Sequence, residues 1–236
     1  MKKTFEPVGV IGAMEQEVRL LIESMQIESE KEIAGMRFTC GLIEGKQAVV
    51  VMCGVGKVNA AICAHTLIRE FGARSVINTG AAGSLNNEIN IGDLVFSTDA
   101  LQYDLDASPL GFAVGEIPYA NVREFPADEE LRRVGEEAAA EAFPGTCIFT
   151  GRICSADTFV ASVEAKERIR REFGGECCEM EGAAIAQACY LNKTPYLIVR
   201  AISDKADGSG DADFSEFSAE ASRKGAELVR RMIEKM

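Results

Sequence analysis

The sequence predicts an α/β fold, a three-layer sandwich with a central mixed β-sheet flanked by helices, built as one domain over residues 1–236. Short apolar runs typical of buried strands alternate with longer amphipathic segments typical of helices. Two neighbouring runs, 36–43 and 47–53, are joined by a Glu-Gly-Lys turn, which predicts a hairpin and therefore a mixed sheet. The chain shows no internal repeat, low-complexity tract or linker that would divide it.

The composition excludes several classes of protein. A net charge of −12 disfavours nucleic acid as a partner, because phosphate binding needs clustered Lys and Arg. No apolar stretch approaches the ~18 residues of a membrane span. The first residues also lack a signal-peptide pattern, so we expect no membrane partner and a cytoplasmic protein. The single histidine, His65, disfavours a Ser-His-Asp triad or a zinc site with several histidines, and we expect no cofactor and no metal.

The first third of the chain alternates strands and helices. Residues 8–12 predict a buried strand, and 14–25 predict a helix with Glu15 and Glu17 in its first turn, where acids favour the helix dipole. After the hairpin, a Gly-Val-Gly-Lys turn at 54–57 leads into a helix over 58–71. This turn satisfies neither the phosphate-loop nor the dinucleotide-binding pattern, so we interpret it as backbone brought close to a ligand.

The rest of the chain continues the alternation. Strands are predicted at 75–79, 93–96, 146–150 and 196–199, and helices at 128–142, 162–173 and from Phe214 to Met236. The first of these strands runs into a small-residue loop at 80–83, which lets a ligand approach the main chain. Residues 102–126 are rich in Pro and Gly and show no helical period, and such long irregular stretches are usually functional.

Two stretches carry the candidate chemistry. Glu179, Met180 and Glu181 precede a small-residue helix, and the strand at 196–199 ends in polar residues that include Ser203 and Asp204. Each alone fits an ordinary helix N-terminus or a strand-to-loop turn. In open α/β sheets, however, ligands bind beyond the carboxyl ends of strands. Together with Glu17, the two stretches predict a site that works with carboxylates.

These stretches resemble a known family. The sequences EMEGAA at 179–184 and VRAISD at 199–204, with GAMEQE at 12–17, are similar to 5′-methylthioadenosine/S-adenosylhomocysteine nucleosidases, which have the nucleoside phosphorylase fold. The resemblance implies hydrolysis of the N-glycosidic bond of methylthioadenosine and adenosylhomocysteine. It would release adenine and a 5-thio-substituted ribose in methionine salvage and the recycling of S-adenosylmethionine by-products. 5′-Deoxyadenosine is a further possible substrate.

The resemblance also implies a role for each candidate residue. Glu17 would activate the attacking water, Asp204 would protonate the departing adenine, and Glu181 would bind the ribose hydroxyls. The remaining substrate-binding candidates are Met180 against the sugar, Arg200 as the partner that orients Glu17, Ser203 beside Asp204, Phe159 stacked on adenine, and Val160, whose backbone would read the edge of the base.

Two departures from the family leave alternatives open. Ala81 stands where many members carry a hydroxyl, and residues 102–126 lack the family's histidine and part of its aromatic pattern. In the family this segment crosses a dimer interface to the partner's alkylthio pocket, so the resemblance implies a homodimer but leaves the 5′ preference open. The alternatives are a purine nucleoside phosphorylase, a futalosine-type hydrolase, or a non-catalytic nucleoside-binding protein. Acidic Glu17 would repel phosphate and disfavours the first, and the presence of all three acids disfavours the last.

Overall fold

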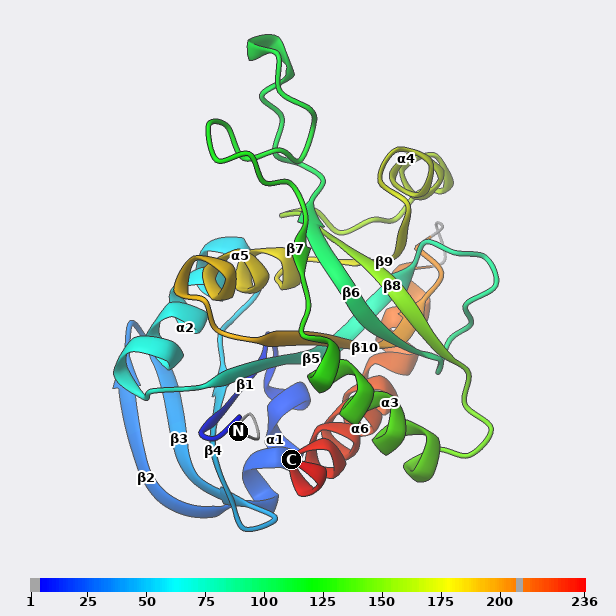
Figure 1. Ribbon diagram of the computed structural model, residues 1–236. Coiled ribbons are helices and arrows are strands. Elements are labelled where there is room, and N and C mark those ends of the chain that lie inside the picture. The colour runs from blue at the N-terminus through cyan, green and yellow to red at the C-terminus, as the bar shows by residue number, and fades with distance from the viewer. Residues whose placement is uncertain (1–4, 207–209) are drawn as a thin grey trace.

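The structure, a computed structural model, describes residues 5–206 and 210–236 (Figure 1). Strands and helices alternate as the sequence predicts. In chain order the elements are β1 (Val8–Gly12), α1 (Glu15–Ser24), β2 (Gln26–Ile33), β3 (Met36–Ile43), β4 (Lys46–Met52), α2 (Lys57–Glu70), β5 (Ser75–Ser84), β6 (Leu94–Gln102), the 3-10 helix η1 (Ser108–Leu110), β7 (Phe125–Pro126), α3 (Glu129–Ala142), β8 (Ile148–Ser155), α4 (Val163–Phe173), β9 (Gly175–Glu179), α5 (Gly182–Asn192), β10 (Tyr196–Asp204) and α6 (Gly210–Lys235).

The strands of the described residues form one mixed sheet. Its order is β10-β6-β8-β9-β5-β1-β4-β3-β2, with β7 paired to β6 and an additional pairing between β10 and β5. Because β10 is parallel to β5 and antiparallel to β6, the strands β5, β9, β8, β6 and β10 close into a ring. The predicted mixed sheet is confirmed, and half of it is barrel-like while the rest, from β1 to β2, is open.

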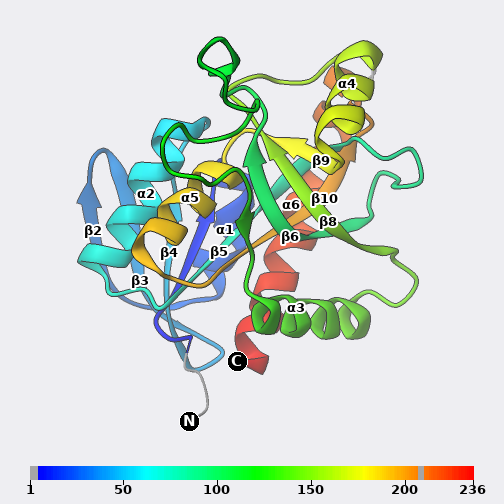
Figure 2. The same cartoon turned by 45° about the horizontal axis from the view of Figure 1, so that its top comes forward.

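Helices cover both faces of the sheet. In Figure 1, α2 and α5 lie above it, whereas α1, α3 and α6 lie below it, and α4 stands apart beside β8 and β9. The turned view in Figure 2 shows the same separation. Two large apolar clusters fill the two interfaces, one containing Leu67 and Ile185 from the upper helices and the other Leu21 and Leu228 from the lower ones. The flanking helical layers agree with the predicted sandwich.

Three strands escaped the sequence-based prediction: β2, β9 and the two-residue β7. Every residue of β2 except its last is exposed, so the strand lacks the buried apolar face that would predict it from sequence. The short β9 reads Gly-Glu-Cys-Cys-Glu and buries its two cysteines as small apolar residues. Periodicity cannot detect these strands, because β2 has no buried side and the other two are too short for alternation to show.

Several predicted strands are longer than expected. β5 continues through the small-residue stretch 80–83, because β10 runs beside it in parallel with Arg200 opposite Gly80. β8 continues past Gly151 and Arg152, where Arg152 forms an ion pair with Asp99 of the neighbouring β6 at 2.6 Å. Pairing with a neighbouring strand therefore extends strands beyond the apolar runs that predicted them.

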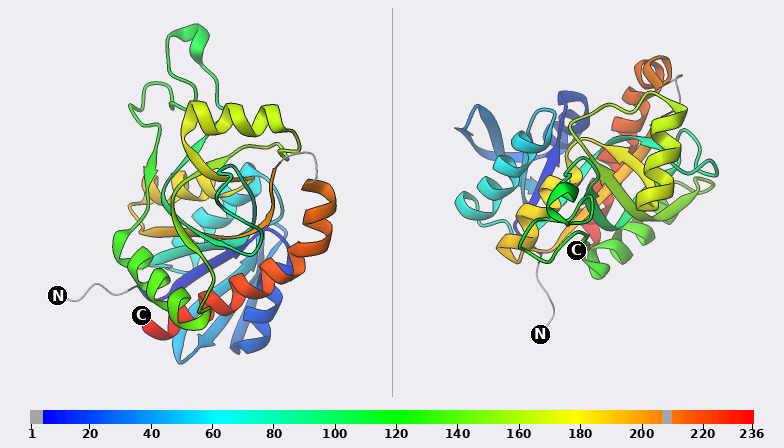
Figure 3. Two further views of the ribbon diagram at one scale, coloured as in Figure 1. Left: turned by 90° about the vertical axis from the view of Figure 1, so that its right-hand side faces the viewer. Right: turned by 90° about the horizontal axis from the view of Figure 1, so that it is seen from above.

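The irregular segment 102–126 projects from the body of the molecule (Figures 1 and 3). It contains η1 and an isolated antiparallel bridge between Ile117 and Val122. The C-terminal helix α6 begins at Gly210 rather than at the predicted Phe214. Within the described residues, no helix has both the length and the apolar character to cross a membrane.

Candidate functional site

A cavity of about 270 Å³ opens at the carboxyl ends of β1, β9 and β10. Segments far apart in the sequence meet there because these strands are close together in the sheet. The lining residues are Ala13, Met14, Glu17, Val55, Ala81, Ala82, Gly83, Thr158, Phe159, Val160, Cys178, Glu179, Met180, Glu181, Ser203 and Asp204. Seven of the eight predicted site residues are in this set, and the eighth, Arg200, lies beneath it.

Glu17 lies in the first turn of α1 and is buried. One carboxylate oxygen accepts hydrogen bonds from the backbone of Ala13 and Met14, at 2.7 and 3.0 Å, and the other accepts one from Ala81 at 3.1 Å. Burial raises the pKa of Glu17, while the charge of Arg200 and these backbone donors act in the opposite direction. At Ala81, where a hydroxyl residue is common in the resembled family, it is the main chain that holds Glu17.

Glu181 precedes α5 and is also buried. Its Oε1 accepts a hydrogen bond of 2.9 Å from the backbone of Gly56, and its Oε2 lies 3.9 Å from Nη2 of Arg200. The Gly-Val-Gly turn, predicted to bring backbone to a ligand, thus contacts a site carboxylate. Burial, and then the charge of Glu179, raise the pKa of Glu181 to about 7.

Arg200 is fully buried in β10. Its Nη2 donates to Oδ1 of Asn78 at 2.5 Å and forms a close ion pair with Glu179. The predicted contact with Glu17 is electrostatic, since the positive charge of Arg200 lowers the pKa of Glu17. The closest charged partner of Arg200 is therefore Glu179 rather than Glu17.

Glu179 is the site residue whose role the sequence did not reveal. It ends β9 and receives hydrogen bonds from the backbone of Gly182 at 2.7 Å and of Glu181 at 3.1 Å, and from the hydroxyl of Ser155. Ser155 lies opposite Glu179 in the pairing of β8 with β9 and also accepts from Ala183 at 2.7 Å. The Glu-Met-Glu motif signalled a second carboxylate, but the sequence assigned no role to Ser155.

Asp204 ends β10 and lines the cavity. Its two carboxylate oxygens accept hydrogen bonds from the Ser203 hydroxyl at 3.0 Å and from the Ala206 backbone at 2.9 Å. The Ser203 side chain is fully buried, and its hydroxyl also lies 3.4 Å from the carbonyl of Ala82. Ser203 therefore contacts Asp204 and positions its carboxylate.

The remaining wall is apolar. Phe159, Val160 and Met180 all line the cavity. Phe159 is 44% exposed, which is unusual for a core phenylalanine. The cavity thus combines an apolar wall suited to a flat ring with carboxylates suited to hydroxyl and amine groups.

A polar clasp joins three segments at the rim of the cavity. Lys57 forms an ion pair of 2.6 Å with Asp104, and the same carboxylate accepts from the backbone of Asp157 at 3.1 Å. Asp157 in turn accepts from the backbone of Lys57 at 2.8 Å, at the start of α2. These contacts tie the Phe159 loop and the 102–126 segment to the turn that holds Glu181. Among the described residues, no group of three or more His, Cys, Asp or Glu side chains is arranged to hold a metal ion.

Comparisons with known proteins agree with this geometry. Residues 7–234 match the family model described as the Phosphorylase superfamily. The 5′-methylthioadenosine/S-adenosylhomocysteine nucleosidase of Staphylococcus carnosus is 37% identical over 230 residues, which cover 97% of this chain and 100% of that protein.

Solved structures show the same likeness. The nucleosidase of that name from Neisseria meningitidis, in complex with methylthio-immucillin-A, has a TM-score of 0.93 and 39% identity, covering 97% of this chain and 99% of that one. The futalosine hydrolase of Helicobacter pylori has a TM-score of 0.92 and 30% identity, covering 97% of each chain. The chain therefore belongs to the Phosphorylase superfamily and, within it, to the 5′-methylthioadenosine/S-adenosylhomocysteine nucleosidases.

Proposed function

We propose that the protein hydrolyses the N-glycosidic bond of 5′-methylthioadenosine and S-adenosylhomocysteine, releasing adenine and the 5-thio-substituted ribose. The observation that carries the proposal is the convergence of Glu17, Glu181 and Asp204, from three distant parts of the chain, on one cavity with an apolar wall. Cleavage of this bond requires a stabilised sugar cation, a protonated leaving group and an activated water. Each carboxylate supplies one of these.

Glu181 binds the ribose in this mechanism. A single described donor, the backbone of Gly56, lies within 3 Å of its carboxylate, so acceptor positions remain for the sugar hydroxyls. An ionised carboxylate at these hydroxyls stabilises the positive charge that develops on the ring as the bond breaks. Met180 packs against the sugar from the same segment, and no metal or cofactor takes part.

Asp204 acts on the leaving group. Adenine leaves poorly as an anion, so a carboxylic acid at N7 lowers the barrier by donating a proton as the bond breaks. Asp204 lies on the same cavity as Phe159 and Val160, where Phe159 stacks on the base and the Val160 backbone reads its edge. The Ser203 hydroxyl and the Ala206 backbone fix the carboxyl group in place.

Glu17 activates the water. Backbone donors from two segments orient its carboxylate, and Arg200 supplies a nearby positive charge that favours the ionised form required of a base. The same negative charge would repel phosphate, which argues against phosphorolysis. The decisive experiment is the incubation of methylthioadenosine in phosphate-free buffer. We expect adenine and free methylthioribose, and a phosphate requirement with release of a sugar 1-phosphate would contradict the proposal.

A futalosine-type hydrolase is the second candidate, because a protein of that name shares the fold at 30% identity. Both reactions would use the same three carboxylates, so the substituent at the 5′ position distinguishes them. Measuring kcat/KM for methylthioadenosine, adenosylhomocysteine, 5′-deoxyadenosine and a futalosine analogue in parallel ranks the candidates. A preference of tenfold or more for the futalosine analogue, roughly 1.4 kcal/mol in transition-state binding, would favour the second.

Three further proposals concern the setting of the reaction. The protein works in the cytoplasm, in methionine salvage and the recycling of S-adenosylmethionine by-products, and it does so as a homodimer. Exposed apolar side chains on neighbouring helices support the dimer, with Val58 of α2 and Leu191 of α5 exposed by 71% and 70%. Such paired apolar surfaces are typical of subunit contacts.

A further inference from the structure

The two glutamates that flank Met180 have very different surroundings. A carboxylate has about four acceptor positions. Those of Glu179 are matched by four donors: the Ser155 hydroxyl, the backbones of Glu181 and Gly182, and the guanidinium of Arg200. Three of these donors reach Oε2 and one reaches Oε1, and the side chain is only 3% exposed although the residue borders the cavity. Glu179 therefore acts through its neighbours rather than on the substrate.

Glu179 is the acceptor in each of these four contacts. Ser155 accepts a hydrogen bond from the backbone of Ala183, so its own proton is free to point at Glu179. Two further N–H groups and a guanidinium donate to the other oxygen of Glu179. The guanidinium of Arg200 is the counter-ion of this carboxylate. Glu179 thus supplies a fixed negative charge beneath the cavity.

Arg200 lies close to Glu179 and also to Glu181 and Glu17. A Cβ atom on Gly80 would collide with both Nη1 of Arg200 and Oε1 of Glu17, which shows how closely these side chains approach the same backbone. Nη2 of Arg200 contacts Glu179 and Asn78, and it lies 3.9 Å from Oε2 of Glu181. Asn78 is itself fixed by donation to the carbonyl of Ile11 at 3.1 Å.

We infer that Glu179 is a positioning residue, which holds Arg200 away from Glu181 and so keeps Glu181 open to the ribose hydroxyls. Without this charge, the nearest anions left to Arg200 are Glu181 and Glu17. An ion pair with Glu181 would use the acceptor positions that the sugar needs. The inference rests on the proposed function, in which Glu181 binds the ribose.

The same arrangement controls the protonation of Glu181. The charged groups that face Glu181 are Glu179 at the end of β9, Arg200 in β10 and Glu17 in α1. The negative charges of Glu179 and Glu17 raise the pKa of Glu181, and the charge of Arg200 lowers it. Neutralising Glu179 therefore lowers the pKa of Glu181 in two ways, by removing a repelling charge and by releasing Arg200 toward it.

The test compares Glu179→Gln with wild type in methylthioadenosine hydrolysis. We expect KM to rise by roughly tenfold or more, through the loss of sugar binding. The pH midpoint assigned to Glu181 should move down, and a crystal structure of the variant should show Arg200 in contact with Glu181. An unchanged KM and pH midpoint, with only a lower melting temperature, would reduce Glu179 to a cap of α5.

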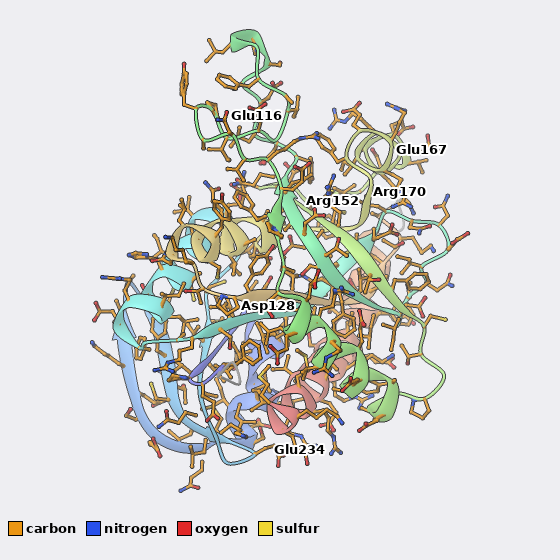
Figure 4. All side chains as sticks on the ribbon, viewed as in Figure 1. Glu116, Asp128, Arg152, Glu167, Arg170 and Glu234 are labelled. Atoms are coloured by element: carbon orange, nitrogen blue, oxygen red, sulfur yellow. The ribbon has the colours of Figure 1, made fainter. Side chains whose placement is uncertain are left out.

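Asp128→Ala is the matched control. Asp128 caps α3, where it accepts from Glu130 at 3.1 Å and Leu131 at 3.0 Å, on the lower side of the sheet (Figure 4). Its loss should lower the melting temperature and leave KM and the pH midpoint unchanged. A shift of either in this control would mean that the loss of any helix cap produces the effect, and would overturn the inference.

Ser155→Ala decides the matter if Glu179→Gln does not fold. It lets the carboxylate of Glu179 turn while retaining its charge, so KM should rise and the pH midpoint should move down less than expected for Glu179→Gln. An unchanged KM in this variant would overturn the inference. The crystal structures are determined without substrate, so they locate Arg200 even if the wild type releases no adenine. A wild type that releases no adenine would refute the proposed function, while the position of Arg200 would still test the role of Glu179.

Discussion

At the scale of single residues, the two acids closest to the proposed chemistry differ in what surrounds them. Asp204 is held by a neighbouring hydroxyl and a backbone amide, both within two residues of it in the chain. Glu181 is held by a turn more than a hundred residues away and faces two other carboxylates. A substitution at Glu181 should therefore change stability as well as chemistry.

Asp204→Asn tests the general acid. Asparagine retains the shape and can donate a hydrogen bond to N7, but it cannot release a proton to the leaving base. We expect normal folding and nucleoside binding within roughly tenfold of wild type, while kcat falls by ~10² or more. The control is Asp93→Asn, which changes a buried aspartate that accepts from Asn90 at 2.8 Å. Near-normal kcat in Asp204→Asn would remove Asp204 from the mechanism.

Glu181 should link activity to pH near neutrality. Its pKa is raised to about 7, so acidification below that value protonates it, and KM for the nucleoside should increase. Glu181→Gln should lower kcat/KM roughly 10- to 100-fold, since hydrogen bonds to charged groups contribute ~1.5–3 kcal/mol. The pH dependence of KM near 7 should also disappear. Its persistence in the variant would assign that ionisation to another group.

Stability should show the opposite trend. A folded-state pKa raised from 4.5 to about 7 means that Glu181 contributes stability fully below pH 4.5 and loses that contribution as the pH rises through 7. Glu181→Gln should therefore raise the melting temperature at pH 8, by about 2–4 °C for each kcal/mol gained. At pH 4 it should have little effect. Thermal unfolding of both proteins at the two pH values measures this difference.

At the scale of elements, the sequence predicted the central strands and the site segments but not how the strands pair. The apolar runs of β1 and β10 and the Glu-Met-Glu motif were visible, and they locate Glu17, Glu181 and Asp204. The network under the cavity was hidden, because Ser155, Asn78 and Arg200 meet only through strand register. Register depends on contacts between distant segments, which local periodicity does not encode.

Gly80 in β5 shows what register requires. It lies opposite Arg200, and its missing side chain leaves the space that Arg200 and Glu17 occupy. Gly80→Ala should displace both side chains and lower kcat/KM by ~10² or more, because small misplacements of reacting groups are costly. The control is Gly9→Ala in β1, whose Cβ would lie 3.0 Å from the apolar side chain of Leu67. The control should lose stability but retain its kinetic constants, and equal activity of the two variants would contradict the argument.

At the scale of the whole molecule, the apolar surface of α2 and α5 predicts a homodimer. Sedimentation should give roughly twice the chain mass of 25.4 kDa. Leu191→Asp should produce monomers, because a charge would be buried in the contact. The control Ile27→Asp, on the exposed strand β2, should remain dimeric. Monomeric wild type at assay concentrations would refute the dimer.

The place of β10 in the sheet has a consequence for the synthesis of the protein. This strand is the last among the described residues, yet it pairs with both β5 and β6 and carries Arg200 and Asp204. Until residue 196 and those after it leave the ribosome, β5 and β6 each expose an unpaired edge and the ring stays open. A growing chain can therefore assemble the Glu17 side of the cavity but cannot cleave a nucleoside. Premature termination before β10 should yield a chain whose strand edges have unpaired backbone N–H and C=O groups. Such a chain should be bound by chaperones or degraded by proteases, and it should have no activity.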